Sequence, residues 1–431
     1  MLRASDFGHL HTHSAFSFGS GPSSITSLVV RAAELGQSFI AITDTSSVTG
    51  IPELVRRCEK ANIQPIGGCE VILEGGSRLT LLANGPTGFS SLCQLLSSAG
   101  MRDIERKGIR VRWEELERYS EDVFCLTGAS PWGVIPRPIL LKRYQEAESA
   151  LERLVRIYGP GNIGIEIVRS WVEDEDSLSL HLFDLADQFQ LPAIATNAVD
   201  YGIQEEFFAH EALCRVRLGV PAGQAHGLLP MNDERYLKSS QEMAALFVDR
   251  PDAIHNAVTL AERLEPPLST QVRHYPRYSQ LPAGESAFSY LCGLTWAGAE
   301  KLGLTDKARL TKELEVIHSK EYCDYFLICR QVIQEARVRG IGCALRGSAI
   351  GSAVLYALEV STHDPIARRV SFERFLSTAR KKPPDIDIDF EHDKRDQMQQ
   401  WLRDTFGQAH VANVCNYVTY RGRSLLRDIG K

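Results

Sequence analysis

Residues 383–390 read PPDIDIDF, and this octapeptide decides how the C-terminal third of the chain folds. Side chains alternate along a strand, so the three aspartates share one face while the two isoleucines face a core. Carboxylates crowded on one face repel one another unless a cation lies between them. Two strand carboxylates two residues apart are therefore expected to bind a pair of Mg²⁺ ions that also hold substrate phosphates. A solvated acidic edge strand is the alternative, which the paired prolines and the two isoleucines disfavour.

A glycine- and serine-rich stretch precedes the aspartates by about 40 residues. Residues 346–352 read RGSAIGS, between an expected strand at 340–345 and the helical stretch AVLYALEV. Glycines let backbone N–H groups approach an anion, and arginine and hydroxyl groups add donors. The residues expected to hold nucleotide phosphates are Arg346, Gly347, Ser348 and Ser352. A simple helix cap is the alternative, but together with the aspartate strand the loop predicts nucleotidyl transfer.

The net charge of −6 conceals a gradient along the 431 residues. Residues 330–431 hold 17 Lys and Arg against 12 Asp and Glu, whereas residues 1–329 hold 31 against 42. A basic last quarter on an acidic body suits a polyanionic partner. The residues expected to contact a nucleic-acid backbone are Lys381, Lys382, Arg421 and Arg423. The acidic runs at 173–176 and 313–315 are expected to be solvated faces.

The first 200 residues alternate short apolar strands with amphipathic helices. This alternation predicts a parallel sheet, long enough here to close as a barrel with its chemistry at the C-terminal strand ends. The expected strands are 38–43, 66–73, 79–83, 123–127, 163–168 and 193–196. The expected helices are 24–35, 51–61, 88–99, 142–158 and 177–189.

A histidine motif, HLHTH at residues 9–13, begins this N-terminal part. His11 and His13 share one face of a short strand and could bind one metal ion. Glu70 lies on another expected strand, and Asp44 ends a third, where further ligands would be placed. Two polar strand-end histidines without a metal are the alternative interpretation.

A second domain follows a proline-rich break. Residues 266–285 carry four prolines without helical periodicity and are expected to be a linker. Helices are expected at 286–303, 306–319, 324–339 and 422–430. The composition, 44% hydrophobic and 24% charged, is typical of a globular protein. No apolar run approaches the ~20 residues of a membrane helix. Ten scattered cysteines without a CxxC motif, and no secretory signal, predict a cytoplasmic protein with free thiols.

Taken together, these motifs resemble the bacterial C-family DNA polymerases, the alpha subunit of DNA polymerase III. The matching segments are KELEVI (312–317), YCDYFLI (322–328), RGSAIGS (346–352), LYALEVSTHDP (355–365), FERFL (372–376), PDIDIDF (384–390) and RDIG (427–430). TYRGRSLLRD (419–428) is similar to the error-prone branch. The resemblance implies an α/β fold, with a PHP-type barrel over 1–265 and the first part of a polymerase-beta-like palm (α+β) over 286–431.

The resemblance implies a DNA-directed DNA polymerase that uses Mg²⁺, dNTPs and a primer-template, and that works with other replication or repair proteins. Asp387 and Asp389 match two of the family's three catalytic aspartates, while Gly347 and Ser348 match its triphosphate loop. The third aspartate lies further downstream in the family, so the 431 residues are expected to be a truncated N-terminal part, inactive alone. The alternatives are a PHP-type phosphoesterase or 3′–5′ exonuclease, and a non-catalytic remnant that binds DNA or a partner.

The N-terminal half departs from the PHP pattern. His11, His13 and Glu70 match expected metal ligands. The positions where the family carries further ligands hold Ser20, Thr45, Arg78 and Ala198. The resemblance therefore implies that the PHP metal, Zn²⁺ or Mn²⁺, is absent and that the barrel has a structural role without proofreading activity.

Overall fold

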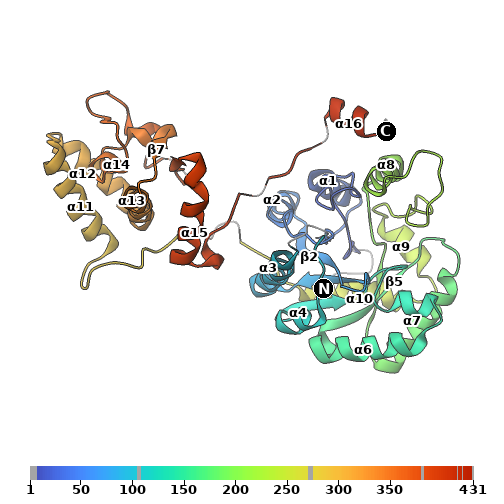
Figure 1. Cartoon of the computed structure of the whole chain (residues 1–431). Helices are drawn as coiled ribbons and strands as arrows, with labels where there is room; N and C mark the ends of the chain where they lie inside the picture. Colours follow the sequence, from blue (N-terminus) through green and yellow to red (C-terminus); the bar gives the residue numbers. More distant parts are fainter. Residues whose placement is uncertain are drawn as a thin grey trace. The chain divides into compact units, whose positions relative to one another are not determined.

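The computed structural model describes residues 7–103, 108–269, 275–379, 383–414, 416–419 and 421–429 (Figure 1). Two compact units are present in this part of the chain. The first comprises residues 1–272 together with 420–431, and the second comprises residues 273–419, wherever these ranges are described. The exact domain boundaries expected from the sequence remain a prediction.

The first unit is built on one six-stranded sheet in the order β1 to β6. The strands are β1 (Phe39–Ile42), β2 (Gln64–Ile72), β3 (Arg78–Ala83), β4 (Val123–Leu126), β5 (Ile163–Val168) and β6 (Ala193–Thr196). All six expected strands are confirmed, but the expected all-parallel arrangement is wrong, because β3 runs antiparallel to both neighbours. Five residues separate β2 from β3, too few for the crossover that a parallel pair needs.

Residues 9–13 connect the two edges of this sheet. The amide of Ala41 in β1 donates to His9 O at 2.8 Å. On the other side, His13 N donates to Val199 O at 2.7 Å and Val199 N donates to His11 O at 2.9 Å. The histidine motif is therefore an edge-joining strand that curls the sheet around, as the barrel prediction requires.

Helices lie around the outside of the curled sheet (Figure 1). Those that pack directly on strands are α2 (Ile51–Ala61) on β2, α3 (Gly85–Arg102) on β3, α6 (Tyr144–Tyr158) on β4, α7 (Glu175–Phe189) on β5 and α10 (Pro251–Arg263) on β6. The others are α1 (Ile25–Glu34), α4 (Trp113–Arg118), α5 (Pro136–Leu140), α8 (Phe207–Leu218) and α9 (Ser240–Leu246). The five expected helices are confirmed, and because helices cover the sheet outside, strand residues are buried on both faces.

The second unit is mainly helical. Its helices are α11 (Ala287–Leu302), α12 (Lys307–Ser319), α13 (Cys323–Val338), α14 (Ala353–Ala357) and α15 (Arg395–Phe406). Two short strands, β7 (Cys343–Arg346) and β8 (Asp387–Phe390), pair antiparallel. The expected final helix is present as α16 (Gly422–Ile429), which belongs to the first unit. No described helix combines the length and the hydropathy needed to cross a membrane.

Candidate functional site

The loop and the aspartate strand lie side by side, because β7 leads directly into the loop and β8 pairs with β7. The register places Arg346 opposite Asp387 and Ala344 opposite Asp389. Gly347 has a φ of +76°, and a Cβ there would lie 3.2 Å from Asp387 Oδ2. Glycine suits this position for its backbone conformation and for the space it leaves beside the carboxylate. Two motifs that are distant in sequence thus form one surface.

The aspartates are exposed and the isoleucines between them are half-buried, as the alternating pattern predicts. Ile386 and Ile388 pack against the core of the second unit. Arg346 Nε lies 3.0 Å from Asp389 Oδ1, and both side chains are about three-fifths exposed, at 61% and 63%. Among the described residues, no third metal-ligating side chain joins Asp387 and Asp389.

Ser352 faces the protein interior instead of the exposed side of the loop. Its hydroxyl is buried and donates to Glu313 Oε2 at 2.9 Å. The same oxygen accepts from Val354 N at 3.1 Å, so a carboxylate already occupies the N-terminus of α14. Arg309 Nε donates to Glu313 Oε1 at 3.0 Å. By this placement Ser352 anchors the loop, whereas Gly347 and Ser348 are exposed.

Glu313 is a residue that the sequence interpretation missed. It was expected on a solvated face, yet it is fully buried, as Glu175 nearly is. Burial raises the pKa of Glu313, although the bonds from Arg309 and the α14 amides counteract the rise. The sequence signal for its burial is the spacing of apolar residues on the helix. Leu310 and Ile317 lie three residues before and four residues after Glu313, on the same helix face.

The structure does not test the predicted DNA contacts at this surface. Lys381 and Lys382 lie outside the described residues. Arg421 and Arg423 are exposed, but they belong to the first unit, whereas the aspartates belong to the second. Their contact with nucleic acid therefore remains a prediction.

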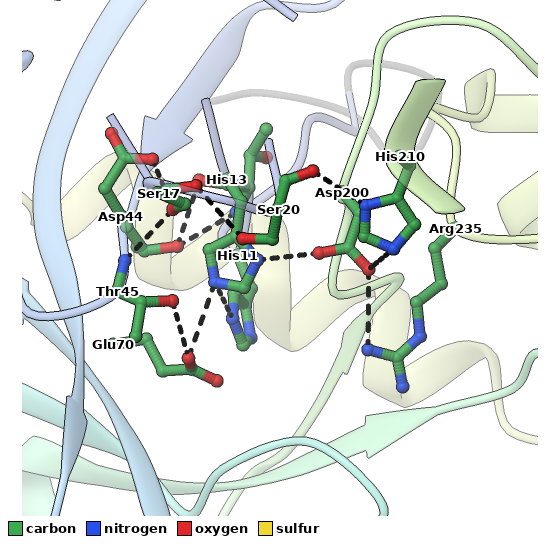
Figure 2. Close-up of polar contacts among 12 residues, drawn as sticks. His11, His13, Ser17, Ser20, Asp44, Thr45, Glu70, Asp200, His210 and Arg235 are labelled. Carbon is green, nitrogen blue, oxygen red and sulfur yellow. Dashed lines mark hydrogen bonds and ion pairs between the residues drawn. The ribbon is translucent and has the colours of Figure 1, made fainter. Parts of the chain in front are cut away.

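A second cluster lies at one end of the curled sheet, where His11 and His13 turn toward each other (Figure 2). Their Nε2 atoms are 3.3 Å apart. His11 Nδ1 lies 2.7 Å from Glu166 Oε1, and His13 Nδ1 lies 2.9 Å from Asp200 Oδ1. A carboxylate on Nδ1 fixes the tautomer that leaves Nε2 available as a ligand. Two such nitrogens at this distance need a proton or a metal ion between them.

Glu70 completes a buried triad with the two histidines. The ligand atoms of His11, His13 and Glu70 all lie within 4.8 Å of one another. Glu70 Oε2 also accepts from Thr45 Oγ1 and from Arg78 Nη1, each at 2.9 Å. Burial opposes ionisation of Glu70, but the charges of Arg78 and the imidazoles hold its pKa below the usual value. The triad could hold at most one metal ion, and its only carboxylate is already paired with a guanidinium, which weakens it as a ligand.

Two carboxylates close to the histidine cluster, those of Asp44 and Asp200, also bond to other protein groups (Figure 2). Asp44 accepts from Ser14 N, Ser14 Oγ and Ser17 Oγ within 2.7 Å. Asp200 Oδ2 lies 3.7 Å from His210 Nε2 and 3.8 Å from Arg235 Nη1. Burial lowers the pKa of His210, but Asp200, the Cys214 thiol and a backbone bond raise it more, to about 9. Arg78 and His210 thus stand beside Glu70 and Asp200 in a cavity of about 400 Å³.

The substituted ligand positions take part in these bonds. Ser20 O accepts from His210 Nδ1 at 2.8 Å, and Thr45 donates to Glu70. Ala198 is buried and offers no ligand atom. The sequence identified these substitutions, but it gave no signal for the pairing of Arg78 with Glu70 or of His210 with Asp200.

Comparisons with known proteins cover both units. A PHP domain matches residues 9–170, and a bacterial DNA polymerase III alpha NTPase domain matches residues 289–431. An error-prone DNA polymerase of Symbiobacterium thermophilum is 38% identical over 99% of this chain and 41% of its own length. One from Pseudomonas aeruginosa is 32% identical over the whole chain and 40% of its own length. An amidohydrolase structure from Chromobacterium violaceum aligns with 55% of this chain and 96% of its own, at 15% identity and a TM-score of 0.33.

The chain spans about two-fifths of the length of the curated relatives it matches. The PHP match contains the His11, His13 and Glu70 cluster, and the polymerase match contains the loop and the aspartate strand. The chain therefore joins a PHP domain to a bacterial DNA polymerase III alpha NTPase domain, and along 99% of its length it is similar to part of an error-prone DNA polymerase.

Proposed function

We propose that the second unit forms the metal- and nucleotide-binding face of a DNA-directed DNA polymerase of the error-prone type. The observation that carries the proposal is the junction of β7, the glycine loop and β8, which sets Gly347 against Asp387. The polymerase III alpha match over these residues supports the same conclusion. The relatives are named error-prone DNA polymerase, and the proposal includes synthesis across damaged DNA on a primer-template, with other repair proteins as partners in the cytoplasm.

Each residue of the surface has a role in this proposal. Asp387 and Asp389 would hold Mg²⁺ through their exposed carboxylates. When bound, the ions would lower the pKa of the primer 3′-hydroxyl and stabilise the leaving pyrophosphate. The amide of Gly347 and the hydroxyl of Ser348 would donate to the triphosphate. Ser352 would act indirectly by anchoring the loop to Glu313.

Binding measurements on the 431-residue chain test this proposal. We expect the chain to bind Mn²⁺ and a magnesium–dNTP complex without extending a primer alone. Asp387→Asn and Asp389→Asn should each weaken Mn²⁺ binding at this surface, because each removes a charged ligand. Asp396→Asn on α15, where the carboxylate is 88% exposed, is the matched control. Equal affinities in all four proteins would contradict the proposal.

Phosphodiester hydrolysis by the barrel is the second candidate, favoured by the convergent His11, His13 and Glu70. We propose instead that the barrel lacks a catalytic metal set and is structural, since Arg78 neutralises Glu70 and serines hold Asp44. Purified chain should contain less than one Zn²⁺ or Mn²⁺ per molecule at the barrel. Manganese-dependent trimming of a DNA 3′ end that disappears in His11→Ala would overturn this assignment.

A further inference from the structure

Arg346 holds a central position at the proposed polymerase surface. It is the last residue of β7, and the chain continues from it directly into the exposed Gly347 and Ser348. Its guanidinium lies 3.0 Å from Asp389 Oδ1. The guanidinium of Arg346 is therefore paired with Asp389, a carboxylate that the proposed function assigns to Mg²⁺. A guanidinium and a divalent cation repel each other and would compete for that oxygen.

The ion pair between Arg346 and Asp389 is weak, so a bound cation can displace it. Both side chains are more than half exposed, so water screens their attraction. Exposed pairs of this kind change an equilibrium constant by no more than about fivefold. Among the described residues, Asp389 is the only hydrogen-bond partner of the Arg346 side chain. A divalent ion that arrives at Asp389 would free the guanidinium completely.

The backbone is held on both sides of the loop, so only the side chain of Arg346 needs to move. At the start of the loop, Arg346 pairs with Asp387 in the β7–β8 ladder. At its end, Arg309 Nη2 donates to Gly351 O and to Val370 O, each at 2.7 Å, and Glu313 holds the neighbouring Ser352. The loop thus keeps its shape while Arg346 changes partner, and the nearest proposed anion site begins at the next residue.

We propose that Arg346 exchanges partners during ligand binding: it holds Asp389 while the metal site is empty, and it moves to the triphosphate once a metal ion occupies Asp389. This inference rests on the proposed function. The exchange couples the two ligands, because the first to bind removes an interaction that opposes the second. Metal and nucleotide should therefore each bind more tightly in the presence of the other.

Affinity measurements on the full 431-residue chain test the exchange, with Mn²⁺ alone and with a magnesium–dATP complex as probes. In Arg346→Gln, Mn²⁺ alone should bind about two- to fivefold more tightly, because the competing charge is gone. The nucleotide complex should bind at least about fivefold more weakly, because a phosphate donor is gone. Arg346→Lys should fall between these values. Arg339→Gln, which removes an i,i+4 pair with Glu335 at the end of α13, should match the wild type.

Opposite changes for the two probes are the signature of the exchange. Weaker or unchanged Mn²⁺ binding in Arg346→Gln overturns it, and so does tighter Mn²⁺ binding with unchanged nucleotide affinity. A wild-type chain that binds neither probe refutes the proposed function, and the exchange with it. A wild-type chain that binds both probes, with Arg346→Gln indistinguishable from it, refutes the exchange alone.

Discussion

Individual side chains in both units satisfy buried charges with several hydrogen-bond partners each. Glu313 accepts from Arg309, Ser352 and the Val354 amide. In the barrel, Glu70 is held by Arg78 and Thr45. A buried carboxylate with several donors is costly to remove, because its partners are left without an acceptor.

Glu313→Ala should lower the free energy of unfolding of the second unit by about 3–4 kcal/mol, because it leaves Arg309 and Ser352 unpaired. Glu313→Gln should cost less, since one oxygen remains to accept. Glu315→Gln, at an exposed position on the same helix, should stay within about 0.5 kcal/mol of the wild type. Urea unfolding measures all three, and equal losses at positions 313 and 315 would refute the role of Glu313.

His210 should make the stability of the first unit depend on pH. Its pKa is raised from 6.5 to about 9 in the folded protein, so folding favours its protonated form. Its contribution, about 3–4 kcal/mol, is complete below pH 6.5 and is lost as the pH rises through 9. His210→Gln should therefore flatten the fall in stability between pH 6 and 10. The exposed His255→Gln is the control, and identical curves for His210→Gln and the wild type would contradict the prediction.

At the scale of elements, the joining strand at residues 9–13 requires a close approach that only glycine permits. A Cβ on Gly8 would lie 2.0 Å from Phe39 O, a backbone atom that cannot move aside cheaply. Gly8→Ala should therefore destabilise the first unit by more than about 2 kcal/mol. Gly161→Ala, with open space around it, should change stability little. Thermal unfolding compares the two, and a Gly8→Ala protein as stable as Gly161→Ala would refute this closure.

The elements differ in how far the sequence predicts them. Continuous apolar runs identified all six strands of the first unit, because both faces of each strand are buried. Helices α4, α5 and α9 have only 5 to 7 residues, too few for helical periodicity to emerge. The direction of β3 depends on a short connection rather than on its own residues. The alternation of Asp387, Ile388 and Asp389 predicted one half of the polymerase surface, but the burial of Glu313 depends on tertiary packing.

At the scale of the molecule, the two compact units have separate hydrophobic cores. We expect two unfolding transitions in calorimetry, since each unit buries its own apolar surface. Gly8→Ala should lower only the transition of the first unit, and Glu313→Ala only that of the second. A single transition that both substitutions shift together would show that the units unfold as one.

The edge-joining strand also sets the order in which the first unit can be completed. His13 bonds to Asp200, 187 residues later, and His11 bonds to Glu166, 155 residues later. During synthesis the two histidines leave the ribosome long before Glu166 and Asp200 do. The N-terminal segment can therefore make these bonds only after most of the first unit has been synthesised. Contacts between such distant residues also slow folding. The histidine cluster can therefore form only after the chain has been synthesised through Asp200.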